Sequence, residues 1–181
     1  MLGTSSRLYV IERLLVQGEA KAYDLAKTSP FAISTIYYTL RKLEDEGCVI
    51  VSRDVYMPTF KCVLEYYREA GCGDAVKSYF RRSLGEYADL VKENDICQLL
   101  DFLVKTGACG KSVVSAVLDA VGGRLADVKK LPEGVTRAFT AALAAGSEYI
   151  DAVHTGAVVG GVFVGYCKRC GLVVAPCPLI K

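Results

Sequence analysis

The chain has 181 residues, of which 52% are hydrophobic, and a formal net charge of +2. This length and apolar content allow one large or two small domains with a substantial core, and they exclude global disorder. Residues 1–61 carry 8 basic and 7 acidic side chains, which excludes a broad basic surface, so any contact with nucleic acid must be local.

Two stretches of the sequence indicate where in the cell the protein is expected. No apolar core follows the first residues, 1–7, so they do not read as a signal peptide. The most lipid-like stretch, Thr155–Cys167, has 13 residues and is shorter than the ~20 that a membrane helix needs. We therefore expect a cytoplasmic protein without a membrane partner.

Apolar residues recur at helical spacing in three segments of the first third of the chain. Gly18 is expected to end the first segment, Pro30 interrupts the chain before the third, and Gly47 ends the third. Ser34 or Thr35 is the expected N-cap of the third helix. The predicted helices cover residues 6–16, 22–27 and 34–46.

A predicted hairpin follows these helices. Residues 48–52 and 58–62 are rich in β-prone side chains, and Arg53–Tyr56 would connect them as a short wing. Two helices across a turn followed by a hairpin predict a winged helix-turn-helix, a shape that fits the major groove of DNA. We therefore expect residues 1–62 to form a domain that binds double-stranded DNA.

The polar side of the third helix is the predicted DNA face. Short polar side chains near the start of such a helix meet base edges, and basic side chains a turn later meet phosphates. The acidic end, Glu44–Glu46, would be repelled by DNA and should point away from it. The candidate DNA-contacting residues are Ser34, Thr35, Tyr38, Thr39, Arg41, Lys42 and Arg53.

Residues 14–53 resemble the winged-helix domain of PadR- and MarR-type transcriptional regulators. The resemblance is carried by the segments Tyr23–Lys27 and Thr35–Gly47, and the second is close to the PadR pattern of Thr-Leu-Tyr followed by Leu-x-x-Leu-Glu-x-x-Gly. It covers about a third of the chain. It implies a homodimeric regulator whose dimerisation region is helical and follows the wing, and it leaves the small-molecule effector unknown.

The remainder of the chain is expected to be helical and then β-like. Together with the winged helix, this predicts a mainly α (α+β) fold with a helical dimerisation or regulatory region over residues 63–154 and a β-like tail over residues 155–181. The pattern is helical again from residue 63, and the further predicted helices are 74–93, 96–105, 113–121 with Ser112 as N-cap, and 135–145 or on to 153. The β-prone runs are 158–159, 162–164 and 172–174.

The tail contains a candidate metal site. Cys167 and Cys170 have the Cys-x-x-Cys spacing of one zinc knuckle, and Cys177 and His154 are candidates for the third and fourth ligands. A cysteine elsewhere in the chain or in a second subunit could also complete the site, and an iron–sulfur cluster would use similar residues. Disulfides of the kind found in hyperthermophiles and free thiols remain alternatives. The chain has only three side-chain amides, which fits a thermophilic source, and an archaeal one is expected.

These patterns favour a sequence-specific, DNA-binding transcriptional regulator that acts as a homodimer. The alternative is a winged-helix module that binds protein within a larger assembly. No carboxylate pair or serine-centred motif points to catalysis, and an enzyme using a cysteine with the single histidine, His154, would need a reactive thiolate. The protein is therefore expected not to be an enzyme.

Overall fold

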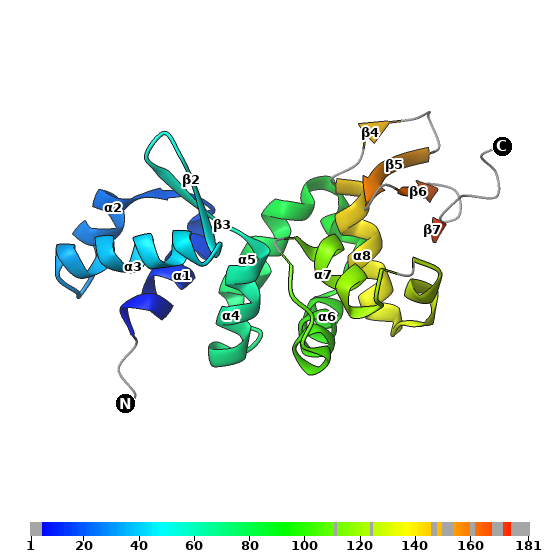
Figure 1. Ribbon diagram of the computed structural model, residues 1–181, viewed down its shortest axis with the longest axis horizontal. Helices are drawn as coiled ribbons and strands as arrows, with labels where there is room; N and C mark the ends of the chain where they lie inside the picture. Colours follow the sequence, from blue (N-terminus) through cyan, green and yellow to red (C-terminus); the bar gives the residue numbers. More distant parts are fainter. Residues whose placement is uncertain are drawn as a thin grey trace. The chain divides into compact units, whose positions relative to one another are not determined.

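The computed structural model describes residues 5–110, 112–123, 125–145, 148–149, 154–159, 162–167 and 172–174. The described chain is mainly helical and has one three-stranded and one four-stranded antiparallel sheet (Figure 1). This is the mainly α (α+β) fold that the sequence predicts. The chain divides into two compact units, residues 1–82 and 83–181.

The N-terminal unit is a winged helix-turn-helix extended by two further helices. Its three-stranded sheet has the order β1-β3-β2, and β2 and β3 form the hairpin (Figure 1). The elements of this unit are α1 (Ser6–Gln17), β1 (Ala20–Lys21), α2 (Ala22–Lys27), α3 (Ile33–Asp45), β2 (Val49–Ser52), β3 (Val55–Pro58), α4 (Phe60–Ala70) and α5 (Asp74–Leu84).

Local signals set several of these boundaries. The side chain of Ser5 accepts a hydrogen bond from the backbone N–H of Leu8 and caps α1. After the C-terminal end of α3, Gly47 has a φ of 75°. This left-handed conformation lets the chain turn directly from the helix into β2. The backbone N–H of Cys48 donates to the carbonyl of Leu43 at 2.8 Å and closes this turn.

Three sequence-based boundaries in this unit were wrong. Helix α3 begins at Ile33 with Ala32 at its N-cap, so neither Ser34 nor Thr35 caps it. The second strand is β3, Val55–Pro58, rather than residues 58–62, so only Arg53 and Asp54 of the predicted wing connect the strands, and α4 begins at Phe60. Phe60 and Cys62 of this stretch are buried within α4 instead.

The core of the N-terminal unit lies where α1, α3 and α4 meet the sheet. Helix α3 buries Ile36, Leu40 and Leu43, which are all fully inaccessible to solvent. The ring of Phe60 on α4 meets that of Phe80 on α5 edge to face, with centroids 6.1 Å apart. Because α4 and α5 share this core, the first compact unit extends to residue 82, beyond the boundary expected at residue 62.

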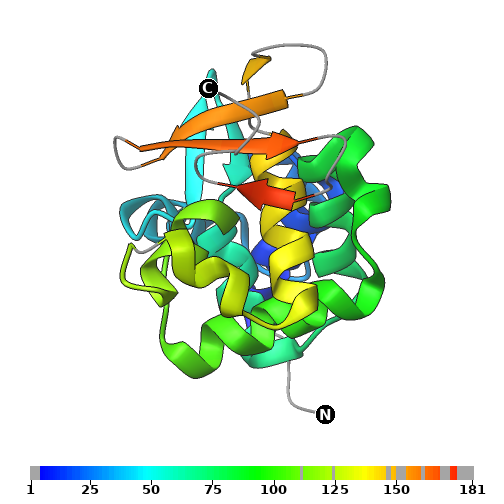
Figure 2. The same cartoon turned by 90° about the vertical axis from the view of Figure 1, so that its right-hand side faces the viewer.

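The C-terminal unit is built around α8. Helix α8 is contacted by helices α6 and α7, by the 3-10 helix η1, and by strands β5 and β6 (Figure 2). The predicted long helix over residues 74–93 breaks at Gly85, where η1 begins. The elements of this unit are η1 (Gly85–Leu90), α6 (Glu93–Thr106), α7 (Val113–Ala120), η2 (Leu125–Lys130), α8 (Glu133–Ala145), β4 (Glu148–Tyr149), β5 (His154–Val159), β6 (Val162–Cys167) and β7 (Leu172–Val174).

Helices α6 and α8 approach closely at Gly134. Its backbone N–H donates to Oε1 of Gln98 at 3.0 Å. A Cβ atom at this position would collide with Oε1 of Gln98 and would lie 2.9 Å from Oδ1 and 3.1 Å from Cα of Asp95. A larger residue therefore requires the Gln98 and Asp95 side chains to move and the α6 backbone to give slightly.

We expect Gly134→Ala to lower the free energy of unfolding by about 1 kcal/mol, because overpacking costs about 1–3 kcal/mol and the better helix propensity of alanine offsets up to about 1 kcal/mol. Thermal unfolding followed by circular dichroism measures the effect. Gly73→Ala is the matched control, because a Cβ atom there has no neighbour within 4 Å. An unchanged or raised melting temperature for Gly134→Ala would contradict the close approach.

None of the helices among the described residues combines the length and apolar character needed to cross a membrane.

Candidate nucleic-acid interface

Helix α3 presents one side to solvent along most of its length. Ser34, Tyr38, Arg41 and Lys42 are exposed, as the sequence predicts for a DNA face, and Thr35 is half-buried at its edge. The opposite side is fixed in the core by Ile36, Leu40 and Leu43. The apolar spacing of the helix therefore determines which side chains can meet a partner.

Thr39 does not belong to this exposed side. Only 6% of its surface is accessible, and its hydroxyl lies 3.1 Å from the hydroxyl of Ser6 on α1. The hydroxyl–hydroxyl contact satisfies a polar group inside the α1–α3 packing. The assignment of Thr39 as a DNA-contacting residue is therefore wrong in this fold, because its position on the helix faces α1.

Tyr38 and Lys42 form a pair on the exposed side. The ammonium nitrogen of Lys42 lies 4.9 Å from the centre of the Tyr38 ring, which is a cation–π contact. The hydrogen bond with Tyr38 also raises the pKa of Lys42, so the amine stays protonated. The pair presents a positive charge beside an aromatic face.

The wing is a hairpin with a two-residue turn. Arg53 and Asp54 have φ angles of 49° and 63°, and a pair of left-handed residues is the geometry of a type I′ turn. Strand β2 of the wing contacts α3, so the two lie side by side. Burial raises the pKa of Tyr56 on β3, Glu44 raises it further, and Arg41 opposes the rise. Arg53 is exposed at the wing's tip.

The acidic end of α3 is tied to the rest of the N-terminal unit. Arg7 on α1 donates to Glu46 and to both oxygens of Glu65 on α4, with 2.8 Å between its Nη2 and Oε2 of Glu65. Lys61 donates to the backbone carbonyl of Glu46 at 2.6 Å. Arg7 thus pairs with the carboxylate of Glu46, and Lys61 satisfies its backbone carbonyl.

Two buried thiols extend this network into the core. The thiol of Cys48 donates to Oε2 of Glu65 at 3.2 Å, and its hydrogen bond with Cys62, together with burial, raises the pKa of the Cys62 thiol. Cys48 and Cys62 are free thiols. The hydrogen bond from Arg7 lowers the pKa of Glu65, which keeps this carboxylate ionised.

The ligand atoms of Glu46, Cys48 and Glu65 lie within 4.8 Å of one another, a spacing that a metal ion could bridge. Arg7 already supplies the positive charge at this place, because its guanidinium pairs with both carboxylates. A cation would have to displace this guanidinium to reach them. We therefore assign the cluster to packing between α1, α3 and α4.

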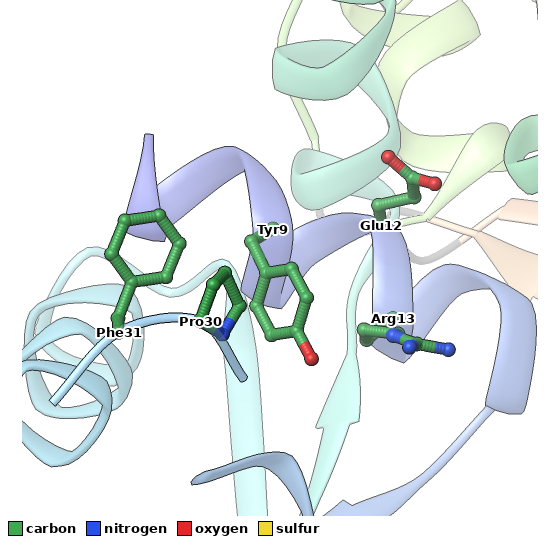
Figure 3. Close-up of a pocket in the computed structure, with 5 residues that line it drawn as sticks. All are labelled: Tyr9, Glu12, Arg13, Pro30 and Phe31. Atoms are coloured by element: carbon green, nitrogen blue, oxygen red, sulfur yellow. The ribbon is translucent and has the colours of Figure 1, made fainter. Parts of the chain in front are cut away.

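A groove of about 600 Å³ opens beside the turn between α2 and α3 (Figure 3). The guanidinium of Arg13 lies 5.6 Å from the centre of the Tyr9 ring, and Tyr9 meets Phe31 edge to face at 6.0 Å. The side chain of Glu12 points away from Arg13 in this view and hydrogen-bonds with Tyr66. The groove thus combines aromatic walls with one guanidinium, a set that suits a planar anionic group.

The predicted metal ligands of the tail are only partly described. His154 and Cys167 lie in β5 and β6, where the strand register pairs them directly. Cys170 and Cys177 lie outside the described residues. The zinc site therefore stays a prediction.

Some residues of the interface were missed by the sequence reasoning. Ile33 and Tyr37 are 58% and 48% exposed, and neither is among the DNA-contacting candidates that the sequence predicts. The helical period could have flagged them, since they lie on the flank of the stripe formed by Ile36, Leu40 and Leu43. No local pattern marks Arg7, because its partners are 39 and 58 residues away.

Residues 6–64 match the family model described as "Sugar-specific transcriptional regulator TrmB". The chain matches no curated protein and no solved structure. The family found is TrmB, whereas the sequence patterns suggested the PadR or MarR type. The match covers α1 to the first half of α4, which is the winged helix-turn-helix described above. This family consists of transcriptional regulators, which bind DNA and are not enzymes. The chain therefore carries a winged helix-turn-helix domain that is similar, over residues 6–64, to that of the TrmB family of transcriptional regulators.

Proposed function

We propose that the protein binds specific DNA sequences as a homodimer, with α3 in the major groove and the tip of the wing beside it. One observation carries the proposal: the exposed side of α3 has Ser34 and Tyr38 in its first two turns and Arg41 and Lys42 in the next. The first pair meets base edges and the second meets phosphates. Arg53 at the wing adds a further cation.

The charge distribution along α3 sets its orientation on DNA. Its C-terminal end is followed by Glu46, and Glu44 and Asp45 are also exposed there. Phosphates repel these carboxylates, so the N-terminal half of the helix enters the groove and the acidic end leaves it.

The presence of a single recognition helix in each chain supports a homodimer. Each chain offers one α3, and dimeric helix-turn-helix proteins place two such helices in half-sites ~34 Å apart. Static light scattering should give a particle of twice the 19.5 kDa chain mass. A monomer at the concentrations that retard DNA would remove the dimer from the proposal.

We expect Arg41→Ala together with Lys42→Ala to weaken binding to all duplexes. Two lost phosphate contacts should reduce the slope of log affinity against log salt by about 1.8, so over a fourfold rise in salt the variant should lose about tenfold less affinity than the original chain. Fluorescence anisotropy with genomic duplexes in increasing salt measures the slope.

The matched control for this prediction is Lys105→Ala with Lys130→Ala. This control also removes two positive charges, but from surface ion pairs with Asp101 and Asp127 in the C-terminal unit. The control should keep the original slope. Equal slopes for the original chain and the Arg41/Lys42 variant would place the docking face elsewhere.

The second candidate is a protein-binding module, favoured by large apolar side chains on the same unit. Tyr23, Ile33 and Tyr38 are each more than half exposed. A module of this kind should retard no duplex from the genome and should be monomeric alone, whereas the regulator should be dimeric and should retard a subset of duplexes. Gel retardation and light scattering on the same sample separate the two.

A further inference from the structure

We propose that the first two turns of α3 recognise thymine by its C5-methyl group, so that the preferred duplex carries thymines where Ile33 and Tyr38 meet the major groove. This inference rests on the proposed DNA binding and specifies its chemistry. It follows from which side chains the exposed side of α3 offers and which it lacks.

The interface lacks the side chains that read adenine by paired hydrogen bonds. Asparagine and glutamine do this through N6 and N7 of the base. The chain has three such residues, Gln17, Asn94 and Gln98, and none lies in α3 or in the β2–β3 hairpin. The α3 carboxylates that could accept from cytosine, Glu44 and Asp45, lie in the last turn, away from the half that enters the groove, and Asp54 lies at the tip of the wing rather than on α3.

The interface offers apolar surface instead. Ile33 and Tyr38 are 58% and 60% exposed, and Tyr37 beside them is 48% exposed. They occupy the first two turns, the part of a recognition helix that reaches base edges. The thymine methyl is the one apolar group on the major-groove edges of the bases. Burying it against these side chains removes apolar surface of both partners from water.

The Tyr38 ring is held in place for such a contact. The ammonium nitrogen of Lys42 lies 4.9 Å from the centre of the Tyr38 ring. This contact restricts the ring and leaves its remaining surface to the DNA. A restrained aromatic side chain loses little conformational freedom on binding. Arg41 remains available for guanine or phosphate, and neither of these carries a methyl group.

The experiment uses the full chain and duplexes in which one atom group changes. Duplexes retained from a randomised pool are sequenced, and each thymine of the best duplex is replaced in turn by deoxyuridine, which lacks only the C5-methyl. We expect about fourfold weaker binding for each contacted thymine, the value of one buried methyl group, and no change at thymines outside the site.

Two variants assign the effect to α3. Ile33→Ala with Tyr38→Ala should bind the thymine and deoxyuridine duplexes equally, and circular dichroism should show an unchanged fold because both side chains are mostly exposed. Arg53→Gly removes a wing cation at a left-handed position that glycine accepts. It should weaken binding to both duplexes while keeping their ratio.

The outcomes distinguish this inference from the function on which it rests. A chain that retains no duplex from the pool contradicts DNA binding itself. A chain that selects a duplex but binds its deoxyuridine form equally well overturns thymine recognition and leaves sequence-specific binding intact. A thymine preference that persists in the Ile33/Tyr38 variant overturns the assignment to these residues.

Discussion

Replacing Asp95 with alanine is expected to lower the free energy of unfolding of the C-terminal unit by about 2 kcal/mol, below the range for a fully buried ion pair because the Arg137 side chain is 32% exposed. Asp95 is 4% exposed and accepts two hydrogen bonds from Arg137, at 2.8 and 2.9 Å. It also accepts one from the backbone N–H of Lys92 at the start of α6. The substitution removes all three and leaves the Arg137 guanidinium with Glu133 as its carboxylate partner.

Urea unfolding, with hydrogen exchange of the α6 and α8 amides, measures this loss in the intact chain. Asp101→Ala is the matched control, because Asp101 pairs with Lys105 at the surface and both side chains are at least half exposed. Exposed pairs contribute at most about 1 kcal/mol. Equal losses for the two variants would show that burial adds nothing to the Asp95 pair.

The same pair predicts a dependence on pH. The hydrogen bond from Arg137 lowers the pKa of Asp95, so ionised Asp95 stabilises the fold at any pH above the unfolded value of about 3.9. This stability is lost as the pH falls through the lower, folded-state pKa. The difference in the free energy of unfolding between the original chain and Asp95→Asn should therefore be constant from neutral pH to about pH 4. It should become smaller below that pH.

Replacing Arg7 with methionine is expected to lower the free energy of unfolding of the N-terminal unit by about 2 kcal/mol, below the range for a fully buried pair because solvent screens this one. The Arg7 and Glu65 side chains are 29% and 24% exposed. Without the guanidinium, Glu65 keeps Cys48 as its hydrogen-bonding partner. The end of α3 also loses its tie to α1 through Glu46.

A double-mutant cycle isolates the Arg7–Glu65 interaction. Glu65→Gln removes the charge of the partner, and the chain carrying both substitutions should be about as stable as Arg7→Met alone, because no unpaired charge is left behind. Urea unfolding of the four proteins gives the coupling energy. Additive effects would show that Arg7 acts through packing of its aliphatic stem.

Much of the N-terminal unit could be predicted from local patterns. The apolar spacing of α1 and α3, the positions of Gly18 and Gly47, and the β-prone run after Gly47 are signals within a few residues of the elements they set. The start of α4 could not be predicted in this way. Phe60–Val63 has β-prone side chains, and only the core formed with α1 and α5 makes the helix the better solution.

The candidate interface also contains residues that local patterns predict and one residue that they do not. The exposure of Ser34, Tyr38, Arg41 and Lys42 follows from the helical period and is confirmed. The period places Thr39 near the boundary of the apolar stripe, and its burial is decided by Ser6 on α1, which is 33 residues away.

The sequence by itself therefore determined the helix-turn-helix, the hairpin and the polar side of α3, because hydrophobic periodicity and turn residues act over short stretches of chain. Only the tertiary structure decided that Arg7 joins the end of α3 to α1 and α4 and that Thr39 is withdrawn from the surface. Most of these contacts join residues that are far apart in the chain, and their partners are set by the packing of whole helices rather than by neighbouring residues.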